Sequence, residues 1–408
     1  MFVEKTDPQI ARLIKKETKR HQETLNLIAS ENYPSKAVRE ALSSLFVTKY
    51  SEGRPYKRYY AGQEFVDRLE TLVEERVRKV FGLNKKWAVN VQPYSGSPAN
   101  YAVLRGLLRP GDKILSLPLS HGGHLTHGAP VSLSGQDFKL VNYFLDKDDL
   151  LDYKEIEKIA KKELPKLIIC GFTAYPRKID FKKFSQISKK VNTYLLADIA
   201  HIAGLIIGGV HPSPFPWADV VMTTTHKTLR GPRGAIIICK KELENKIFKK
   251  VFPGLQGGPH GHTICAIGVA LREAMKPSFR KYAQQIVKNA RALAEALEKY
   301  DFKLISGGTD NHLVLVDLTN KNISGKEAQD LLEIAGIVLN KNTVPYDPRP
   351  SFDPSGIRLG TPALTTRGMK EKEMKKIAFW INEVISNPKS VPKIKQEVKK
   401  LCKKFPIP

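Results

Sequence analysis

Lys227 has the clearest potential for chemistry in this sequence. It follows the apolar and threonine-rich stretch VVMTTT, stands next to His226 and precedes GPRG within the same motif. A lysine at the end of a buried strand can lose its proton and attack a carbonyl carbon, which forms a Schiff base with a carbonyl cofactor. Taken alone, the position leaves open that Lys227 is a loop lysine without a chemical role.

Asp198 ends a second apolar stretch, TYLLAD, and His201 follows three residues later. A carboxylate at the carboxyl edge of a buried strand needs a partner. The pyridinium nitrogen of pyridoxal phosphate is one such partner, because an acid keeps that nitrogen protonated and makes the ring an electron acceptor. Two alternatives stay open: Asp198 caps the next helix, and His201 is a core histidine with satisfied hydrogen bonds.

A phosphate site is indicated by the motif VQPYSGSPAN. Its residues Ser95, Gly96 and Ser97 form a small turn before a predicted helix. Backbone N–H groups and hydroxyls at a helix N-terminus bind phosphate, although Ser-Gly turns are common. The pair Gly257-Gly258 in FPGLQGGP is a second candidate for the same role.

Histidines and an arginine complete the set of candidate residues. The motif HGGHLTHG spaces His121, His124 and His127 by three residues, without the cysteine, carboxylate or HExxH pattern of a zinc site. We therefore expect no metal, and a histidine ring stacked on a planar cofactor fits better. Arg358 in SGIRLGTP presents a guanidinium fork suited to a carboxylate.

Buried strands and helices must position these residues. From about residue 85 to 240, short apolar runs alternate with helical patterns, which is typical of an α/β fold with a mainly parallel sheet. The clearest strand candidates are KILSLP, KLIICGF, TYLLAD, VVMTTT and AIIIC, and the helical stretches between them are ANYAVLRGLL, YKEIEKIAKKEL and DFKKFSQISKKV. Asp7-Pro8 predicts the start of an N-terminal helix.

A second, smaller α+β unit is predicted after a long helix over residues 277–300. Its elements are LVLVDL, GKEAQDLLEIAG, IVLN, GIRLGT, KEMKKIAFWINEVI and the lysine-rich C-terminal helix. We expect an N-terminal helical arm over residues 1–20, a large domain over 21–276 and a small C-terminal domain over 277–408.

Composition narrows the classes of protein that fit. The 408 residues carry a net charge of +26, which suits nucleic acid, acidic lipid or anionic small molecules as partners. No apolar stretch approaches the roughly 20 residues that cross a bilayer. The N-terminus lacks a secretory signal, and four cysteines are too few for a disulfide scaffold, so we expect a cytoplasmic protein with buried reduced thiols at Cys170 and Cys239.

Over nearly its whole length the sequence resembles the serine hydroxymethyltransferase family in its compact microbial form. The motifs that carry the resemblance are LIASENYPS, KYSEGRPYKRYYAGQEFVD, VQPYSGSPAN, HGGHLTHG, ADIAHIAGL, TTTHKTLRGPRG, FPGLQGGP, SGGTDNHL and SGIRLGTPA. The resemblance implies a fold-type I pyridoxal phosphate enzyme that transfers the hydroxymethyl group of serine to tetrahydrofolate or a related tetrahydropterin. The products are glycine and the methylene form of the pterin. The resemblance also implies a side aldolase activity of the enzyme on 3-hydroxy amino acids.

The resemblance also implies roles for individual residues, with Lys227 as the internal-aldimine lysine and Glu52 as the proton-transfer carboxylate. The catalytic set is Lys227, Glu52, His124, Asp198, Tyr60 and Thr224. The cofactor set is Tyr50, Ser95, Gly96, Ser97, His124, Thr173, Asp198, His201, His226, Lys227 and Gly258. The substrate set is Ser30, Tyr60, His201 and Arg358, and the folate set is Glu52, Leu119, Gly123, Leu125 and Asn342.

In this family Tyr50, Glu52, Tyr60 and Gly258 reach into the neighbouring subunit's site, which implies a homodimer with shared active sites, or a tetramer. A threonine aldolase or another fold-type I enzyme is the competing enzyme hypothesis, and it would need no folate residues. A different class is an RNA-binding protein, since the segment RPYKRYY mixes basic and aromatic residues. No RNP, KH, helix-turn-helix or zinc-finger signature accompanies that segment.

Overall fold

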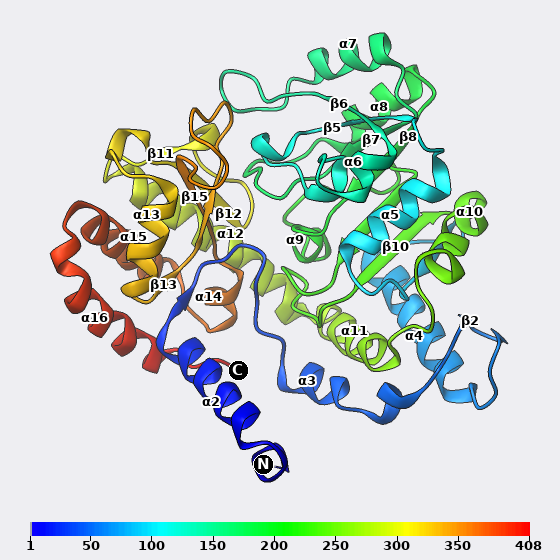
Figure 1. The fold of residues 1–408 in the computed structure, drawn as a ribbon, viewed down its shortest axis with the longest axis horizontal. Helices are drawn as coiled ribbons and strands as arrows, with labels where there is room; N and C mark the ends of the chain where they lie inside the picture. The colour runs from blue at the N-terminus through cyan, green and yellow to red at the C-terminus, as the bar shows by residue number, and fades with distance from the viewer. Residues whose placement is uncertain (1) are drawn as a thin grey trace.

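A seven-stranded sheet forms the centre of the larger part of the molecule, in a computed structural model that describes residues 2–408 (Figure 1). Its strands are β4 (Trp87–Asn90), β5 (Lys113–Ser116), β6 (Lys139–Asn142), β7 (Leu167–Cys170), β8 (Tyr194–Asp198), β9 (Val220–Thr224) and β10 (Ala235–Lys240). They lie in the order β4-β10-β9-β8-β7-β5-β6. All pairs from β9 to β6 are parallel, whereas β10 is antiparallel to both of its neighbours. The expected α/β fold with a mainly parallel, mixed sheet is confirmed.

Each of the five predicted strands of this sheet is present, and two more complete it. β6 is an edge strand whose four residues are all partly or fully exposed, so it lacks the apolar run that marks a strand buried on both faces. β4 is buried throughout, and its sequence WAVN ends in the polar residue Asn90.

Amphipathic helices connect and cover the strands. The predicted helices are α5 (Gly96–Leu107), α7 (Tyr153–Glu163) and α8 (Phe181–Lys190). The remaining helices of this part are α3 (Lys36–Leu42), α4 (Glu64–Phe81), α6 (Leu133–Asp137), α9 (Ala203–Ile207), α10 (Glu244–Lys249) and α11 (Gly261–Ala274). Helix α8 is an example of such an amphipathic helix. Asp180 caps its first turn, and Phe184 and Ile187 face the core.

The chain begins with the short helix α1 (Phe2–Thr6) and the predicted N-terminal helix α2 (Pro8–Glu23). Asp7 caps α2, since its Oδ1 atom accepts hydrogen bonds from the N–H groups of Gln9 and Ile10 at 3.0 Å. Pro8 occupies the first helical turn, where no N–H partner is needed. The start of this helix is therefore as the sequence predicts.

A four-stranded antiparallel sheet and its helices form the smaller part, at the left of Figure 1. The strands are β11 (Lys303–Leu304), β12 (Leu313–Asp317), β15 (Gly356–Gly360) and β14 (Asn340–Asn342), in that order. The helices are α12 (Pro277–Glu298), α13 (Gly325–Ile334), α14 (Pro362–Thr366), α15 (Glu371–Ser386) and α16 (Val391–Lys404). Elements of the second unit predicted from sequence thus appear with closely similar bounds.

The N-terminal segment also packs on this smaller part. β1 (Leu25–Asn26) pairs in parallel with β13 (Ile337–Val338), and Leu25 and Leu27 lie in the second hydrophobic cluster. Helix α12 contributes to both clusters, with Ile286 in the first and Leu293 in the second. β1 lies in the range predicted for the large domain and α12 in the range predicted for the small domain, yet each also packs against the other part. The predicted division at residues 21, 276 and 277 stays a prediction.

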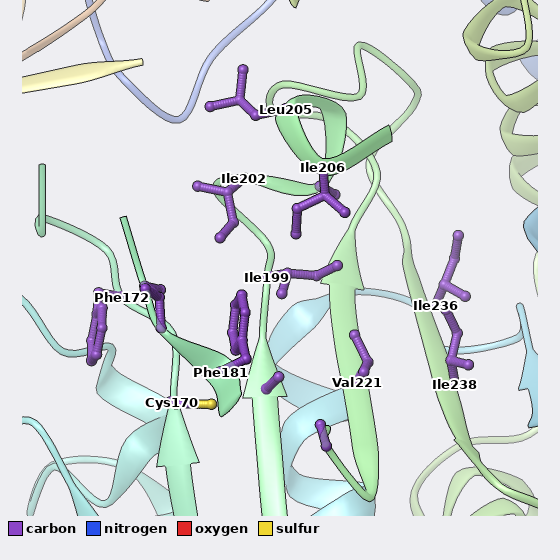
Figure 2. Packing of buried hydrophobic residues seen from close by; sticks show 14 of the residues in the cluster. Cys170, Phe172, Phe181, Ile199, Ile202, Leu205, Ile206, Val221, Ile236 and Ile238 are labelled. Atoms are coloured by element: carbon purple, nitrogen blue, oxygen red, sulfur yellow. The ribbon is translucent and has the colours of Figure 1, made fainter. Parts of the chain in front are cut away.

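Figure 2 shows part of the first cluster, in which Cys170, Ile199, Val221 and Ile238 belong to neighbouring strands and the turns after them. This apolar layer holds the strand ends firmly, because packed interiors tolerate little displacement. Cys170 and Cys239 are buried free thiols, as expected. Among residues 2–408, no helix combines the length and apolar character needed to cross a bilayer.

Candidate active site

A cavity of about 310 Å³ opens at the carboxyl ends of β7, β8 and β9. Asp198 is the last residue of β8, and Thr224 is the last residue of β9. This edge is where open α/β sheets bind ligands. The sequence-predicted residues that line the cavity are Ser30, Ser95, Gly96, Ser97, His124, Thr173, Asp198, His201, Thr224, His226, Lys227 and Arg358.

Lys227 is buried in the wall of this cavity and is only 8% exposed. Its Nζ atom donates a hydrogen bond to Oγ1 of Thr224 at 3.1 Å, and its backbone carbonyl accepts one from Asn32 at 2.9 Å. Burial lowers the pKa of Lys227 to about 8, although the charge of Asp198 acts in the opposite direction. A neutral amine is therefore accessible near physiological pH, which is what attack on a carbonyl carbon requires.

Asp198 is buried and ionised. Burial works against the charge, but hydrogen bonds from His127 and Asn100 outweigh it and hold the pKa of Asp198 well below its usual range. His127 Nε2 lies 3.0 Å and Asn100 Nδ2 lies 2.9 Å from the same Oδ2 atom. Oδ1 accepts from the N–H of Ala200. The carboxylate is thus oriented before any ligand arrives.

Gly171 allows the backbone to approach Asp198 closely. A Cβ atom at this position would lie 1.9 Å from the carbonyl oxygen of Asp198, and the φ of +126° is one that other residues rarely adopt. The turn after β7 therefore needs glycine in order to pack beside the end of β8.

An anion fits the part of the cavity next to α5. Ser95 is the N-cap of this 12-residue helix, and its hydroxyl makes no capping hydrogen bond. The Nδ1 atom of His226 is buried without a hydrogen-bond partner in residues 2–408, and Arg233 adds a positive charge to the same cavity. Free backbone N–H groups at a helix N-terminus, with an unpartnered imidazole and a guanidinium, suit the phosphate of pyridoxal phosphate.

Arg358 enters the cavity from the other side, on β15 of the smaller sheet. Nη1 donates to the carbonyl of Thr173 at 2.9 Å, and Nε donates to Oδ1 of Asn340 at 3.2 Å. Burial lowers the pKa of Arg358 to about 10, so the guanidinium stays charged at neutral pH. Its position bridges the two sheets, with a cationic fork facing the cavity.

His201 forms a buried pair with His312, with 3.1 Å between Nδ1 and Nε2. Burial lowers the pKa of His201 well below its usual value and that of His312 to about 3, so both rings are neutral. A neutral His201 offers either a proton donor or an acceptor to the cavity, depending on the tautomer.

The three histidines of HGGHLTHG diverge. His121 packs edge-on against the rings of Phe144 and Tyr346, His124 lines the cavity, and His127 bonds Asp198. Burial lowers the pKa of His124 to about 4, so its ring is uncharged. In the part of the chain that the structure describes, no group of three or more His, Cys, Asp or Glu side chains is arranged for a metal ion.

Other predicted residues lie away from this cavity in their own chain. Tyr50 and Tyr60 have ring centroids 5.1 Å apart in an edge-to-face pair, and Tyr94 Oη donates to the carbonyl of Gly258 at 2.7 Å. Glu52 lies beside this group, since a Cβ on Gly257 would stand 3.2 Å from Oε1 of Glu52. The predicted residues outside the cavity lining are Tyr50, Glu52, Tyr60, Leu119, Gly123, Leu125, Gly258 and Asn342.

Among the folate candidates, Leu119 and Leu125 have exposed side chains in the turns on either side of His124. Gly123 packs tightly between them, because a Cβ there would lie 2.1 Å from the carbonyl of Leu117. Asn342 is in β14, where its side chain donates to the carbonyl of Thr343.

The sequence reasoning missed several residues of the site. Asn100, His127, Arg233 and His312 touch the cavity or its buried side chains, but no role was expected for them. Only His127 carried a signal, through its regular spacing from His124.

The chain is similar in sequence to proteins of one known family. Residues 3–381 match the family model described as "Serine hydroxymethyltransferase". The chain is 54% identical over 409 aligned residues to a serine hydroxymethyltransferase of Desulfotalea psychrophila (strain LSv54 / DSM 12343), with 100% of this chain and 96% of that protein covered.

The chain belongs to the serine hydroxymethyltransferase family. A serine hydroxymethyltransferase of Acidothermus cellulolyticus (strain ATCC 43068 / DSM 8971 / 11B) is also 54% identical, with 99% of this chain and 96% of that protein covered. Membership confirms the expected fold-type I architecture, pyridoxal phosphate as cofactor and tetrahydrofolate as co-substrate. It also confirms serine and glycine interconversion as the activity, in preference to a threonine aldolase.

Proposed function

We propose that this chain carries out hydroxymethyl transfer between serine and tetrahydrofolate in the cavity at the end of β8. One observation carries the assignment: buried Lys227, Asp198 and Arg358 converge on a single cavity that also contains an anion cradle. An amine, a carboxylate, a guanidinium and a phosphate site are the groups that an amino-acid-processing pyridoxal phosphate enzyme needs.

Pyridoxal phosphate would be held at four points. Ser95, Gly96, Ser97, His226 and Thr173, which line the cavity, would hold the phosphate. Asp198 would keep a proton at the pyridine nitrogen, and His124 would cover the ring. Lys227 provides the amine for the carbonyl carbon, assisted by Thr224. When bound, the cofactor supplies an electron-accepting ring for cleavage of the bond between Cα and Cβ of serine.

Arg358 binds the substrate carboxylate, with Ser30 beside it and His201 on the cofactor side. The carbonyl of Thr173 and the amide of Asn340 hold the guanidinium in place, so little motion remains to be lost when serine binds. Holding the carboxylate also fixes which bond at Cα faces the reactive ring, and such orientation lowers the barrier.

The enzyme acts as a homodimer, or as a tetramer built from dimers, in which each cavity is completed by the neighbouring chain. Tyr50, Glu52, Tyr60 and Gly258 cluster outside their own cavity, which fits a contribution to the other one. The same region exposes many large apolar side chains, namely Leu45, Val47, Tyr50, Tyr56, Tyr59, Tyr60, Phe65 and Leu72. An exposed apolar patch of this kind is typical of a subunit interface.

Tetrahydrofolate would lie between Leu119, Gly123 and Leu125 on one chain, near Asn342, and Glu52 on the other. Glu52 would move a proton near the serine hydroxyl and the folate. The exposed leucines offer apolar surface for a flat pterin ring, which supports this placement.

The decisive experiment is an absorption spectrum of the purified, cofactor-loaded protein with glycine, recorded with and without tetrahydrofolate. We expect a long-wavelength band that grows when tetrahydrofolate is added, and serine turnover that depends on it. A band unaffected by tetrahydrofolate, together with folate-independent serine turnover, would contradict the proposal.

RNA binding and a cytoplasmic location stay predictions. For RNA, the segment RPYKRYY offers less than its sequence suggests, because Arg54 and Arg58 are engaged by the acids Asp67, Glu70 and Glu74. A salt-sensitive mobility shift with RNA would support binding, and its absence at low salt would end the hypothesis.

A further inference from the structure

Arg58 clamps the backbone on both sides of Glu52. Its Nη1 atom donates to the carbonyl of Ser51 at 2.9 Å and to the carbonyl of Gly53 at 2.7 Å. The side chain of Arg58 is only 3% exposed, so water does not compete for these bonds. The residue between the two clamped carbonyls is Glu52.

Two acidic residues on α4 bind the guanidinium of Arg58 and fix its position. Arg58 Nε pairs with Asp67 at 2.8 Å, and Nη2 pairs with Glu70 at 2.6 Å. The side chain of Glu70 is 0% exposed, and it also pairs with Arg54. A buried ion pair in which the guanidinium donates four hydrogen bonds fixes geometry strongly, although it adds little net stability.

Gln92 connects this clamp to the rest of the site. Its Nε2 atom donates to the carbonyl of Gly53 and to Oε1 of Glu70, both at 2.8 Å. Its backbone carbonyl accepts from Gln256 at 2.7 Å, and Gln256 directly precedes Gly257-Gly258. Gln92 also lies three residues before Ser95 of the anion cradle.

The carboxylate of Glu52 has no comparable support of its own. Within residues 2–408, no hydrogen bond to this carboxylate is formed, while the backbone of Glu52 accepts one from Tyr59. The position of the carboxylate is therefore set mainly through its backbone.

We propose that Arg58 and Gln92 are positioning residues that place Glu52 for proton transfer in the neighbouring subunit's cavity. This inference rests on the proposed role of Glu52 and on the shared site. It adds that the precision of one cavity depends on a buried ion-pair network inside the other chain.

The first test compares Arg58→Lys and Gln92→Met with the wild type as loaded holoenzymes, with rates normalised to bound cofactor. Lysine keeps the charge but cannot bond both carbonyls and both acids at once. We expect folate-dependent kcat to fall about tenfold or more, since small misplacements of a reacting group carry costs of that order. The KM for serine and folate-independent cleavage of a 3-hydroxy amino acid should stay within about twofold.

Arg68→Lys is the matched control. Arg68 lies on the same helix, is 68% exposed and pairs only loosely with Glu64. Thermal unfolding of each variant shows whether the fold survives. If Arg58→Lys and Gln92→Met are folded and keep wild-type folate-dependent kcat, the positioning role is wrong. An equal loss of both activities would also contradict it, because that result indicates general damage.

A mixed-dimer experiment tests whether the effect acts across the interface. Lys227→Ala subunits, which supply an intact Glu52 loop, are co-expressed with Arg58→Lys subunits, which supply an intact Lys227. Each mixed dimer then contains one cavity with both groups correct, so activity should exceed that of either variant alone. Mixing that gives only the average of the two variants would overturn the inference.

The same mixing with Glu52→Gln separates this inference from the proposal beneath it. If Glu52→Gln is not rescued by Lys227→Ala subunits, the shared site itself is wrong. If Glu52→Gln is rescued but Arg58→Lys is not, Arg58 acts within its own cavity and only the positioning inference fails.

Discussion

Nε2 of His127 lies 3.0 Å from Oδ2 of Asp198, and both side chains are buried. Asn100 donates to the same oxygen. The carboxylate that faces the cavity is therefore fixed by residues that do not themselves need to touch the cofactor ring. Hydrogen-bond partners such as His127 and Asn100 orient the carboxylate that contacts a ligand.

We predict that His127→Leu weakens cofactor binding and lowers kcat/KM by about tenfold to a hundredfold, since a hydrogen bond to a charged group contributes about 1.5–3 kcal/mol. Titration of the protein with pyridoxal phosphate and steady-state kinetics measure the two effects. His121→Phe serves as the control, because His121 lies against Phe144 and Tyr346. Wild-type cofactor affinity in His127→Leu would contradict this role.

Among residues 2–408, Lys227 is the only lysine that lines the cavity, and its replacement removes that amine. In Lys227→Ala we expect loss of the visible absorption of covalently bound cofactor and of turnover, with the fold retained. Absorbance and serine turnover check this, and circular dichroism provides the control for folding. A variant with normal activity would remove Lys227 from the mechanism.

The lowered pKa of Lys227 predicts a pH dependence. Burial lowers the value from 10.5 to about 8, so the neutral amine becomes predominant above that pH. The rate at which cofactor-free protein captures pyridoxal phosphate should rise about tenfold per pH unit below pH 8 and level off above it. Stopped-flow absorbance from pH 6 to 10 measures it, and a rate still rising steeply at pH 10 would exclude a lowered pKa.

The same shift affects stability. Between about pH 8 and 10.5 the unfolded chain holds a proton on this lysine that the folded chain does not. The contribution of Lys227 to the free energy of unfolding of cofactor-free protein should therefore increase with pH across this window. Denaturant titrations of the wild type and Lys227→Met should converge or cross as the pH rises.

Glu52→Gln should bind serine normally but lose folate-dependent turnover, because the amide keeps the shape of the side chain and cannot take up a proton. Serine binding is read from the cofactor absorption, and turnover from formation of the methylene folate. Rates close to those of the wild type would show that another group moves the proton.

Gly171→Ala should destabilise the protein by about 3 kcal/mol or more, because the new Cβ would overlap the carbonyl of Asp198 at a positive φ. Gly111→Ala is the control. Gly111 has a φ of +88°, and apart from its chain neighbours no atom of residues 2–408 lies within 4 Å of the added carbon, so only the backbone cost of about 1–2 kcal/mol applies. Equal losses in the two variants would contradict the close-approach argument.

Most of the candidate site was predictable where chemistry-bearing residues end apolar runs. Asp198 is the last residue of one buried strand and Lys227 follows another, and parallel strands bring such ends to one edge. Strand direction was less accessible: β10 has the same apolar composition as its neighbours but runs antiparallel to them. A continuous apolar run indicates burial on both faces, which is typical of parallel sheets, but it does not identify the one strand of such a sheet that runs antiparallel.

The supporting contacts were not predictable in the same way. His127 bonds a residue 71 positions away and His201 one 111 positions away, and pairs so distant leave no periodic trace in the sequence. Arg58 likewise reads as part of a basic, aromatic surface segment until α4 places Asp67 and Glu70 against it. The contacts of His127, His201 and Arg58 become apparent only when the positions of their partners in the fold are known.

The pairing of β1 with β13 has a consequence for how the protein is made. Leu25 and Ile337 stand about 310 residues apart in the chain, and the carbonyl of Leu27 accepts from the N–H of Gly360. During synthesis, residues 25–29 are made long before residues 337–360 and cannot dock until that later segment exists. Leu25 and Leu27 therefore stay without their native partners until then, and the wall that carries Ser30 closes only after Gly360 has been made.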